Sequence, residues 1–69
     1  MSAGTTIKLL REKAGMTQMQ LSVIADVGQA SISAYERGLY EPEMKTFEKI
    51  VNVLGYELVV RKKKTEVEE

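Results

Sequence analysis

Few side chains of this protein are suited to catalysis, and the types that are missing exclude several kinds of chemistry. The 69 residues include no histidine and no cysteine. This composition removes thiolate nucleophiles, disulfides, the commonest zinc ligands and the side chain best suited to proton transfer near neutral pH. The one aspartate, Asp26, and the glutamates show no clustering that would tune one carboxyl group as an acid against another as a base. We therefore expect no enzyme, no metal site and no cofactor.

Length and charge indicate one small domain with a modest basic excess. Ten Lys and Arg balance ten Asp and Glu, but three of the glutamates lie within residues 65–69. Met1 to Lys64 consequently carries ten basic and seven acidic groups, a net charge of +3. A domain of this size buries only about 60% of its unfolded surface, and without disulfides or metal we expect a second copy to support it. The part expected to fold is thus mildly basic and dimeric.

No stretch of the sequence is typical of a targeted or membrane-bound chain. The apolar runs are only a few residues long, too short to span a bilayer. The segment Met1 to Gly4 has neither the charged start nor the apolar core of a signal peptide. We expect a cytoplasmic location and no membrane partner.

The spacing of apolar residues predicts four short helices, an all-α fold. Apolar residues recur at intervals of three and four, and each such run is followed by a residue that commonly ends a helix. This pattern predicts helices at about Thr6 to Ala14, Gln18 to Ala25, Gln29 to Glu36 and Met44 to Leu54. The second helix starts with a capping box, in which Thr17 and Gln20 each satisfy a backbone N–H of the other. The predicted core consists of Ile7, Leu10, Leu21, Val27, Ile32, Tyr35, Phe47, Ile50 and Leu54, with Met16 and Met44 filling gaps.

After Gly55 the pattern changes to the alternation of a β-strand. Tyr56, Leu58 and Val60 fall on one face of an extended segment with β-branched content. No second segment can supply a ladder, so we expect residues 56–62 to pair antiparallel with the same strand of a second copy about a two-fold axis. The alternative is an extended tail that packs on the helices. The predicted parts are a helical domain at 1–55, a dimerisation strand at 56–62 and a mobile charged tail at 63–69.

The second and third predicted helices carry a specific motif. It consists of Thr17-Gln18-Met19-Gln20-Leu21, then Val27, then Ile32-Ser33-Ala34-Tyr35-Glu36-Arg37-Gly38. This pattern resembles the lambda-repressor-like (Cro, or xenobiotic-response-element) helix-turn-helix family, which reads T-Q-x-x-L, V and I-S-x-x-E-R-G at these spacings. The resemblance covers about Ile7 to Gly55. It implies a four-helix DNA-binding domain whose third helix enters the major groove of DNA.

The resemblance also implies which residues contact DNA. The base-reading positions are Gln29, Ala30, Ser33 and Ala34. Gln29 has an amide that can bond the N6 and N7 edge of adenine, whereas the other three offer only methyl groups or a hydroxyl. The phosphate-contacting positions at the start of the second helix are Thr17 and Gln18, and Gln18 is also expected to brace Gln29. After the third helix, where this sequence lacks the lysines of many relatives, Arg37 and the Tyr40 hydroxyl are the candidates for phosphate contact. Arg11 and Glu36 match a structural ion pair between the first and third helices. Without the motif, both glutamines would be ordinary surface residues near helix starts.

Two departures from the family pattern bear on these expectations. Asp26 stands at the turn where the family usually has glycine, and a left-handed conformation is less favourable for Asp than for Gly. The loop Leu39-Tyr40-Glu41 lacks the lysines that many relatives direct at phosphates. We therefore expect a slightly strained turn and a shallow salt dependence of DNA binding by each copy.

The leading interpretation is a homodimeric transcriptional repressor that binds double-stranded DNA at a pseudo-palindromic operator. The strand after Gly55, together with residues 29–33 and 46–50, resembles the small antitoxins of Hip-type toxin–antitoxin modules, which would add a toxin protein as a partner. The alternative from a different class is a protein-binding module that mainly neutralises a toxin or another regulator, with DNA contact secondary. The neutral formal charge, the poorly basic loop and the tail, in which three lysines are followed by an acidic stretch, favour that alternative.

Overall fold

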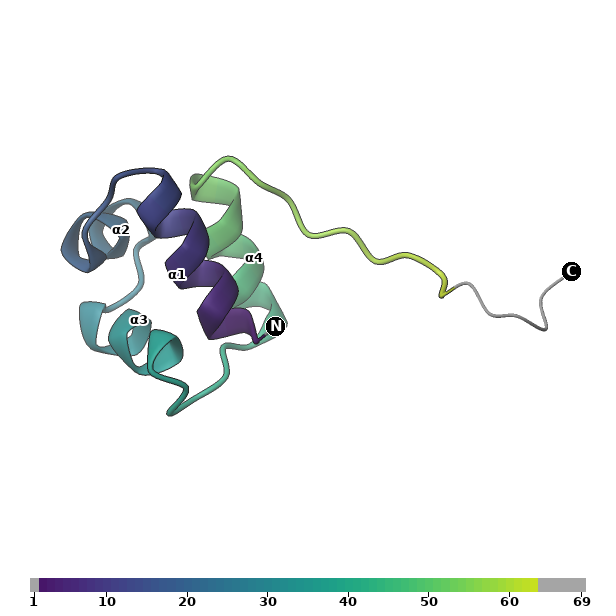
Figure 1. The fold of residues 1–69 in the computed structure, drawn as a ribbon, viewed down its shortest axis with the longest axis horizontal. Helices are drawn as coiled ribbons and strands as arrows, with labels where there is room; N and C mark the ends of the chain where they lie inside the picture. The colour runs from purple at the N-terminus through teal and green to yellow at the C-terminus, as the bar shows by residue number, and fades with distance from the viewer. Residues whose placement is uncertain (1, 64–69) are drawn as a thin grey trace, which may run out of the picture.

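A computed structural model describes residues 2–63 of the chain. These residues form the predicted four helices, α1 Ala3–Lys13, α2 Gln18–Ala25, α3 Gln29–Glu36 and α4 Met44–Val53. Helix α1 packs against α3 and α4, and α2 packs against the same two helices. In Figure 1, α1 crosses in front of α4, with α2 and α3 to its left. The all-α prediction is confirmed, and no described helix has the length and apolar character needed to cross a membrane.

The helix ends follow from local backbone chemistry. The expected bounds of α2 and α3 are confirmed, and so is the capping box, since Thr17 Oγ1 accepts from the Gln20 N–H and the Gln20 amide oxygen accepts from the Thr17 N–H. Helix α1 begins one turn earlier than predicted. Its start is capped by Ser2, whose hydroxyl accepts from the Thr5 N–H, so residues too polar for an apolar pattern are still helical.

The core lies where all four helices meet. Its buried members are Ile7, Leu21, Ala25, Ile32 and Ile50, and Val27, Tyr35, Phe47 and Leu54 pack against them. Every residue of this set except Ala25 was in the predicted core. The structure contradicts the prediction for Met44, which is 67% exposed. Met44 is the first residue of α4, where the apolar stripe already points away from the centre of the bundle.

Gly4 sets the distance between α1 and α3, a role that the sequence analysis missed. A Cβ added at Gly4 would lie 1.8 Å from the backbone oxygen of Tyr35. The first turn of α1 therefore meets the backbone of α3 directly, with no side chain between them. No periodicity of apolar residues could have indicated this contact, because glycine carries no hydropathy signal.

The segment after Gly55 leaves the helical domain. Residues 56–63 run away from the helices without forming a strand within the described part of the chain (Figure 1). This contradicts the alternative in which the segment packs on the helices, apart from the partly buried Leu58. Pairing with a second copy stays a prediction, because a strand needs a partner to form a ladder. The predicted mobile tail lies outside the described residues, except for Lys63.

Candidate nucleic-acid interface

The turn between α2 and α3 is tight and includes the one left-handed residue other than glycine among residues 2–63. Asp26 has φ 56° and ψ 47°, as the comparison with the family pattern predicted. Its carbonyl accepts a hydrogen bond at 3.2 Å from Nζ of Lys49 on α4. Val27 follows, packed on the core and half-buried. The turn is thus held by the hydrogen bond from Lys49 and by the packing of Val27 on the core, and these contacts fix the angle between α2 and α3.

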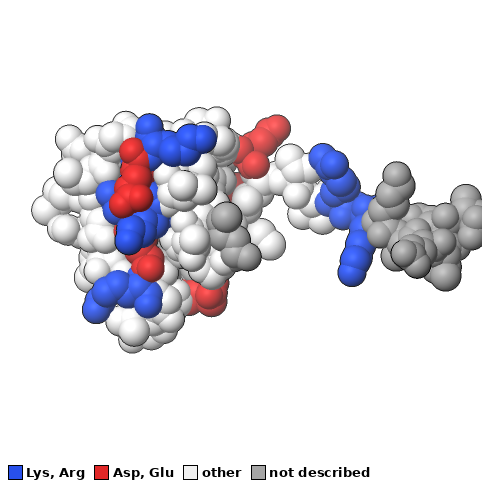
Figure 2. All heavy atoms as spheres, viewed as in Figure 1, with Lys and Arg blue, Asp and Glu red and all other residues white. Residues whose placement is uncertain are grey.

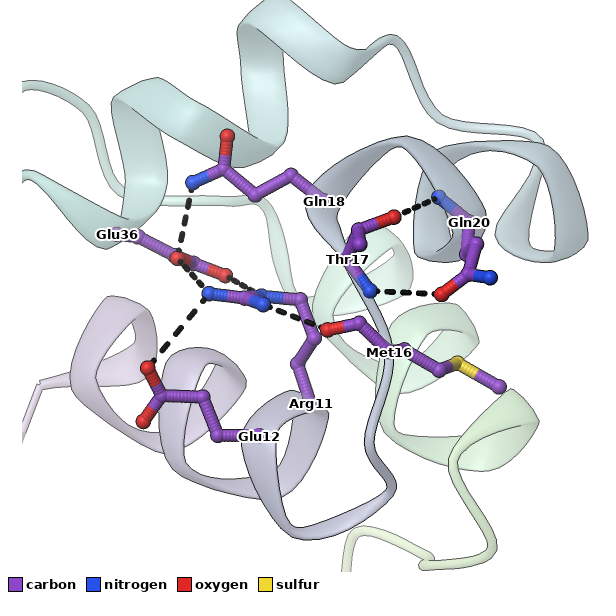
Figure 3. A network of polar contacts seen from close by, with 7 residues as sticks. All are labelled: Arg11, Glu12, Met16, Thr17, Gln18, Gln20 and Glu36. Carbon is purple, nitrogen blue, oxygen red and sulfur yellow. Dashed lines mark hydrogen bonds and ion pairs between the residues drawn. The ribbon is translucent and has the colours of Figure 1, made fainter.

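A polar network holds the far end of α3. Nε of Arg11 donates to Oε2 of Glu36 at 2.7 Å, and its Nη2 donates to Oε1 at 3.0 Å, a bidentate pair. Nη1 of Arg11 donates to the carbonyl of Met16 at 2.7 Å. Gln18 completes the network by donating from Nε2 to Oε1 of Glu36 at 3.0 Å. Figure 3 shows that these side chains converge from α1, α2 and α3 on one point, so the predicted ion pair is confirmed.

The charges in this network are nearly removed from water. The side chain of Glu36 is 3% exposed and that of Arg11 is 11% exposed. Burial raises the pKa of Glu36, but the hydrogen bonds from Arg11 and Gln18 outweigh it and bring the pKa below its ordinary value. The hydrogen bond to Glu36 raises the pKa of Arg11. A carboxylate in the last turn of α3 opposes the helix dipole, and the guanidinium compensates for it.

The structure corrects the expected partner of Gln18. Its side-chain amide bonds Glu36 at the end of α3, and no hydrogen bond joins it to Gln29 within the described residues. Its position at the first residue of α2 is as predicted. Thr17 and Gln18 therefore lie beside the free N–H groups of the α2 start, where an anion is favoured by the helix dipole.

The predicted base-reading residues that are most exposed to solvent lie in the first turn of α3. Gln29 and Ala30 are exposed and Ser33 is half-buried. Gly28 caps the helix without a side-chain bond, so the N–H groups of this turn stay open to solvent. Ala34 requires a correction, since it is 6% exposed and mostly faces the core. Ser31, which is not among the predicted base-reading residues, is also exposed on this turn.

A hollow adjoins this face between α3 and α4. It has a volume of about 480 Å³ and is lined by Ala30, Ser31, Ala34 and Tyr35 of α3, the loop residues Tyr40, Glu41 and Glu43, and Thr46 of α4. Tyr40, one of the lining residues, is exposed, and Arg37 is exposed just after α3. Both predicted phosphate contacts in this region are accessible.

The charge of the helical domain differs from the expectation. Residues 2–55 carry six basic and six acidic side chains, so the part that folds is neutral and the predicted basic excess lies beyond α4. Figure 2 shows blue and red atoms alternating over the helical domain, and basic side chains gathered on the extended segment. Within residues 2–63, no group of three or more acidic side chains could hold a metal ion.

Comparison with known proteins agrees with this geometry. The helix-turn-helix family matches residues 7–60, which include all of α2, α3 and α4. This match covers more than half of the chain, so the protein belongs to the helix-turn-helix family. The resemblance noted from its residues is confirmed.

Two curated relatives are named as a repressor and as a transcriptional regulator. The immunity repressor protein of Bacillus phage phi105 is 31% identical over 58 residues, covering 84% of this chain. The HTH-type transcriptional regulator ImmR of Bacillus subtilis strain 168 is 32% identical over an alignment of 75 positions, covering 97% of this chain. The chain spans 40% of the length of the first and 59% of the second. No solved structure matches the chain.

Proposed function

We propose that this protein is a sequence-specific, DNA-binding transcriptional repressor that acts as a homodimer in the cytoplasm. The observation that carries the proposal is the first turn of α3. Gln29 and Ala30 are exposed there, on a helix held at its start by the Asp26 turn and at its end by Glu36. A rigid helix with an exposed amide at its N-terminal turn suits entry into the major groove. The names of the two relatives support the same role.

Each residue of the proposed interface has a defined task. Gln29 bonds the edge of adenine, and Ala30 and Ser33 offer a methyl group and a hydroxyl to neighbouring bases. Ala34 contributes at most a methyl contact, because only 6% of its surface is exposed where it lines the hollow. Phosphate contacts are made by Thr17 and Gln18 at the start of α2, and by Arg37 and Tyr40 after α3.

The extended segment is the proposed dimerisation element. Tyr56 is exposed, Leu58 is half-buried and Val60 is 91% exposed, so most of the apolar surface of this face is open to water in the single chain. Pairing of residues 56–62 with the same segment of a second copy satisfies the backbone groups of both. Two copies of α3 then read half-sites about 34–36 Å apart, one turn of the double helix.

A titration with labelled DNA tests this function. The protein is titrated against a duplex from the region upstream of its own gene and against a scrambled duplex of equal length and composition, at two salt concentrations. We expect saturable preference for the upstream duplex. Equal binding to both duplexes, or binding to neither, would contradict the proposal.

Variants assign the reading helix in the same assay. Gln29→Ala should remove roughly 1–3 kcal/mol of discrimination at one base position, whereas Gln18→Ala should weaken binding to every duplex. Gln20→Ala is the matched control, because this glutamine caps α2 and should affect stability but not base preference. Wild-type preference in Gln29→Ala would show that another helix reads the bases.

A second candidate function is favoured by exposed apolar side chains on α2. Met19 and Val23 lie one helical turn apart and are 56% and 71% exposed. Such a face suits a protein partner, as in an antitoxin that neutralises a toxin. A toxin-like gene next to this one, and co-purification of its product with the chain, would favour this function. Without such a neighbour the antitoxin interpretation fails.

A further inference from the structure

The helical domain has few cations to offer to DNA. Residues 2–55 have no net charge. Two of their six basic side chains are already engaged, since Arg11 binds Glu36 and Lys49 donates to the carbonyl of Asp26. A duplex carries one negative charge for about every 1.7 Å of its axis. The phosphates around the helix-turn-helix therefore meet a surface with little charge to neutralise them.

The positive charge of the described chain lies beyond the last helix. Arg61, Lys62 and Lys63, which we call the basic arm, are all exposed, and Glu57 is the one acidic side chain within residues 56–63. The arm stands at the end of the extended segment, away from the carboxylates of the helical domain (Figures 1 and 2). Because extended backbone advances about 3.3 Å per residue, the arm reaches up to roughly 26 Å beyond Gly55.

We propose that the basic arm binds the phosphate backbone of the duplex that α3 reads, as a second DNA contact of the chain. This inference rests on the proposed function, because it requires DNA in the groove at α3. Phosphate contacts carry no base information, so the arm adds affinity and salt dependence while α3 retains the preference for sequence. Antiparallel pairing of the two strands would direct each arm past the start of its partner's strand, toward the partner's helical domain.

The test compares two double variants of the full chain that remove equal charge. Arg61→Gln with Lys63→Gln removes two charges from the arm. Lys8→Gln with Lys13→Gln removes two exposed charges from α1 and is the matched control. For each variant and the wild type, the affinity for the upstream duplex and for the scrambled duplex is measured at several salt concentrations.

The slope of log affinity against log salt is the deciding quantity. Each phosphate contact contributes about 0.9 to this slope, so the arm variant should lose about 1.8 per chain and the control less than about 0.5. The ratio of the affinities for the two duplexes should not change in the arm variant. An unchanged slope in the arm variant, or an equal loss in the control, would overturn the inference while the proposed function stands. Absence of preference in the wild type would overturn the proposed function instead.

Discussion

At the scale of single residues, the most consequential group is the carboxylate of Glu36. It lies almost fully buried at the end of α3, where the helix dipole opposes a negative charge. Arg11 and Gln18 donate all three of the hydrogen bonds that it receives within the described chain. The end of α3 is therefore held by one bidentate ion pair and one amide.

Removal of Arg11 should leave that carboxylate without its counter-charge. We expect Arg11→Met to lower the free energy of unfolding by about 3–5 kcal/mol, because an unpaired buried charge remains. Arg11→Met combined with Glu36→Met should recover more than half of the loss, since neither charge is then buried alone. Urea denaturation followed by circular dichroism measures both variants. A double variant as unstable as the single one would show that the pair is not the cause.

The same carboxylate should make stability depend on pH. The pKa of Glu36 is lower in the folded chain than its ordinary value, so the folded state favours the ionised form. Its stabilisation is complete above the ordinary glutamate pKa of about 4.3 and is lost as the pH falls through the lower, folded value. Denaturation midpoints of the wild type should decline below about pH 4.3. Glu36→Gln should show a smaller decline, and an equal decline would assign the effect to other groups.

At the scale of elements, the packing of α1 on α3 depends on the missing side chain of Gly4. Gly4→Ala should lower the free energy of unfolding by about 1–3 kcal/mol, because its methyl group would overlap the backbone at Tyr35 and push the helices apart. Gly28→Ala is the control, since an added Cβ there meets only Ser31 Oγ at 3.8 Å and its cost should be limited to the weaker N-cap preference of alanine, under about 1 kcal/mol. Thermal denaturation of the two variants would separate steric overlap from a general preference for glycine. Equal midpoints would contradict this account.

The turn between α2 and α3 carries a conformational cost that can be removed. Asp26 is left-handed, a region in which glycine is favoured over residues with a Cβ. Asp26→Gly should raise the free energy of unfolding by up to about 1 kcal/mol, and Asp26→Ala should lower it. Chemical denaturation gives both values. A destabilised Gly variant would mean that the aspartate side chain contributes more than its backbone strain costs.

At the scale of the whole molecule, exposed apolar surface after α4 predicts self-association. Val60→Asp should break pairing of the two segments, so sedimentation equilibrium should give a monomer and the thermal midpoint should no longer rise with protein concentration. Val59→Asp is the control on the opposite face, where the side chain is already exposed. A monomeric wild type at all concentrations would contradict the dimer.

The described structure also shows how much local sequence patterns can predict. The bounds of α2 and α3, the capping box and most of the core depended on residues within a few positions of one another, and these predictions were confirmed. The expected Gln18–Gln29 contact and the groove-facing Ala34 depended on how two helices cross. Helical spacing alone does not determine which neighbour an amide reaches or how deep a methyl group lies.

The amino-acid sequence by itself determined the four helices and the class of protein, because caps, apolar periodicity and a spaced motif are local properties. Only the tertiary structure decided that Gly4 brings α1 onto α3 and that Glu36 binds both Arg11 and Gln18. It also decided that the folded domain is neutral while the basic arm stands apart from it. These features depend on contacts between residues far apart in the chain and on where the fold ends, which no local pattern specifies.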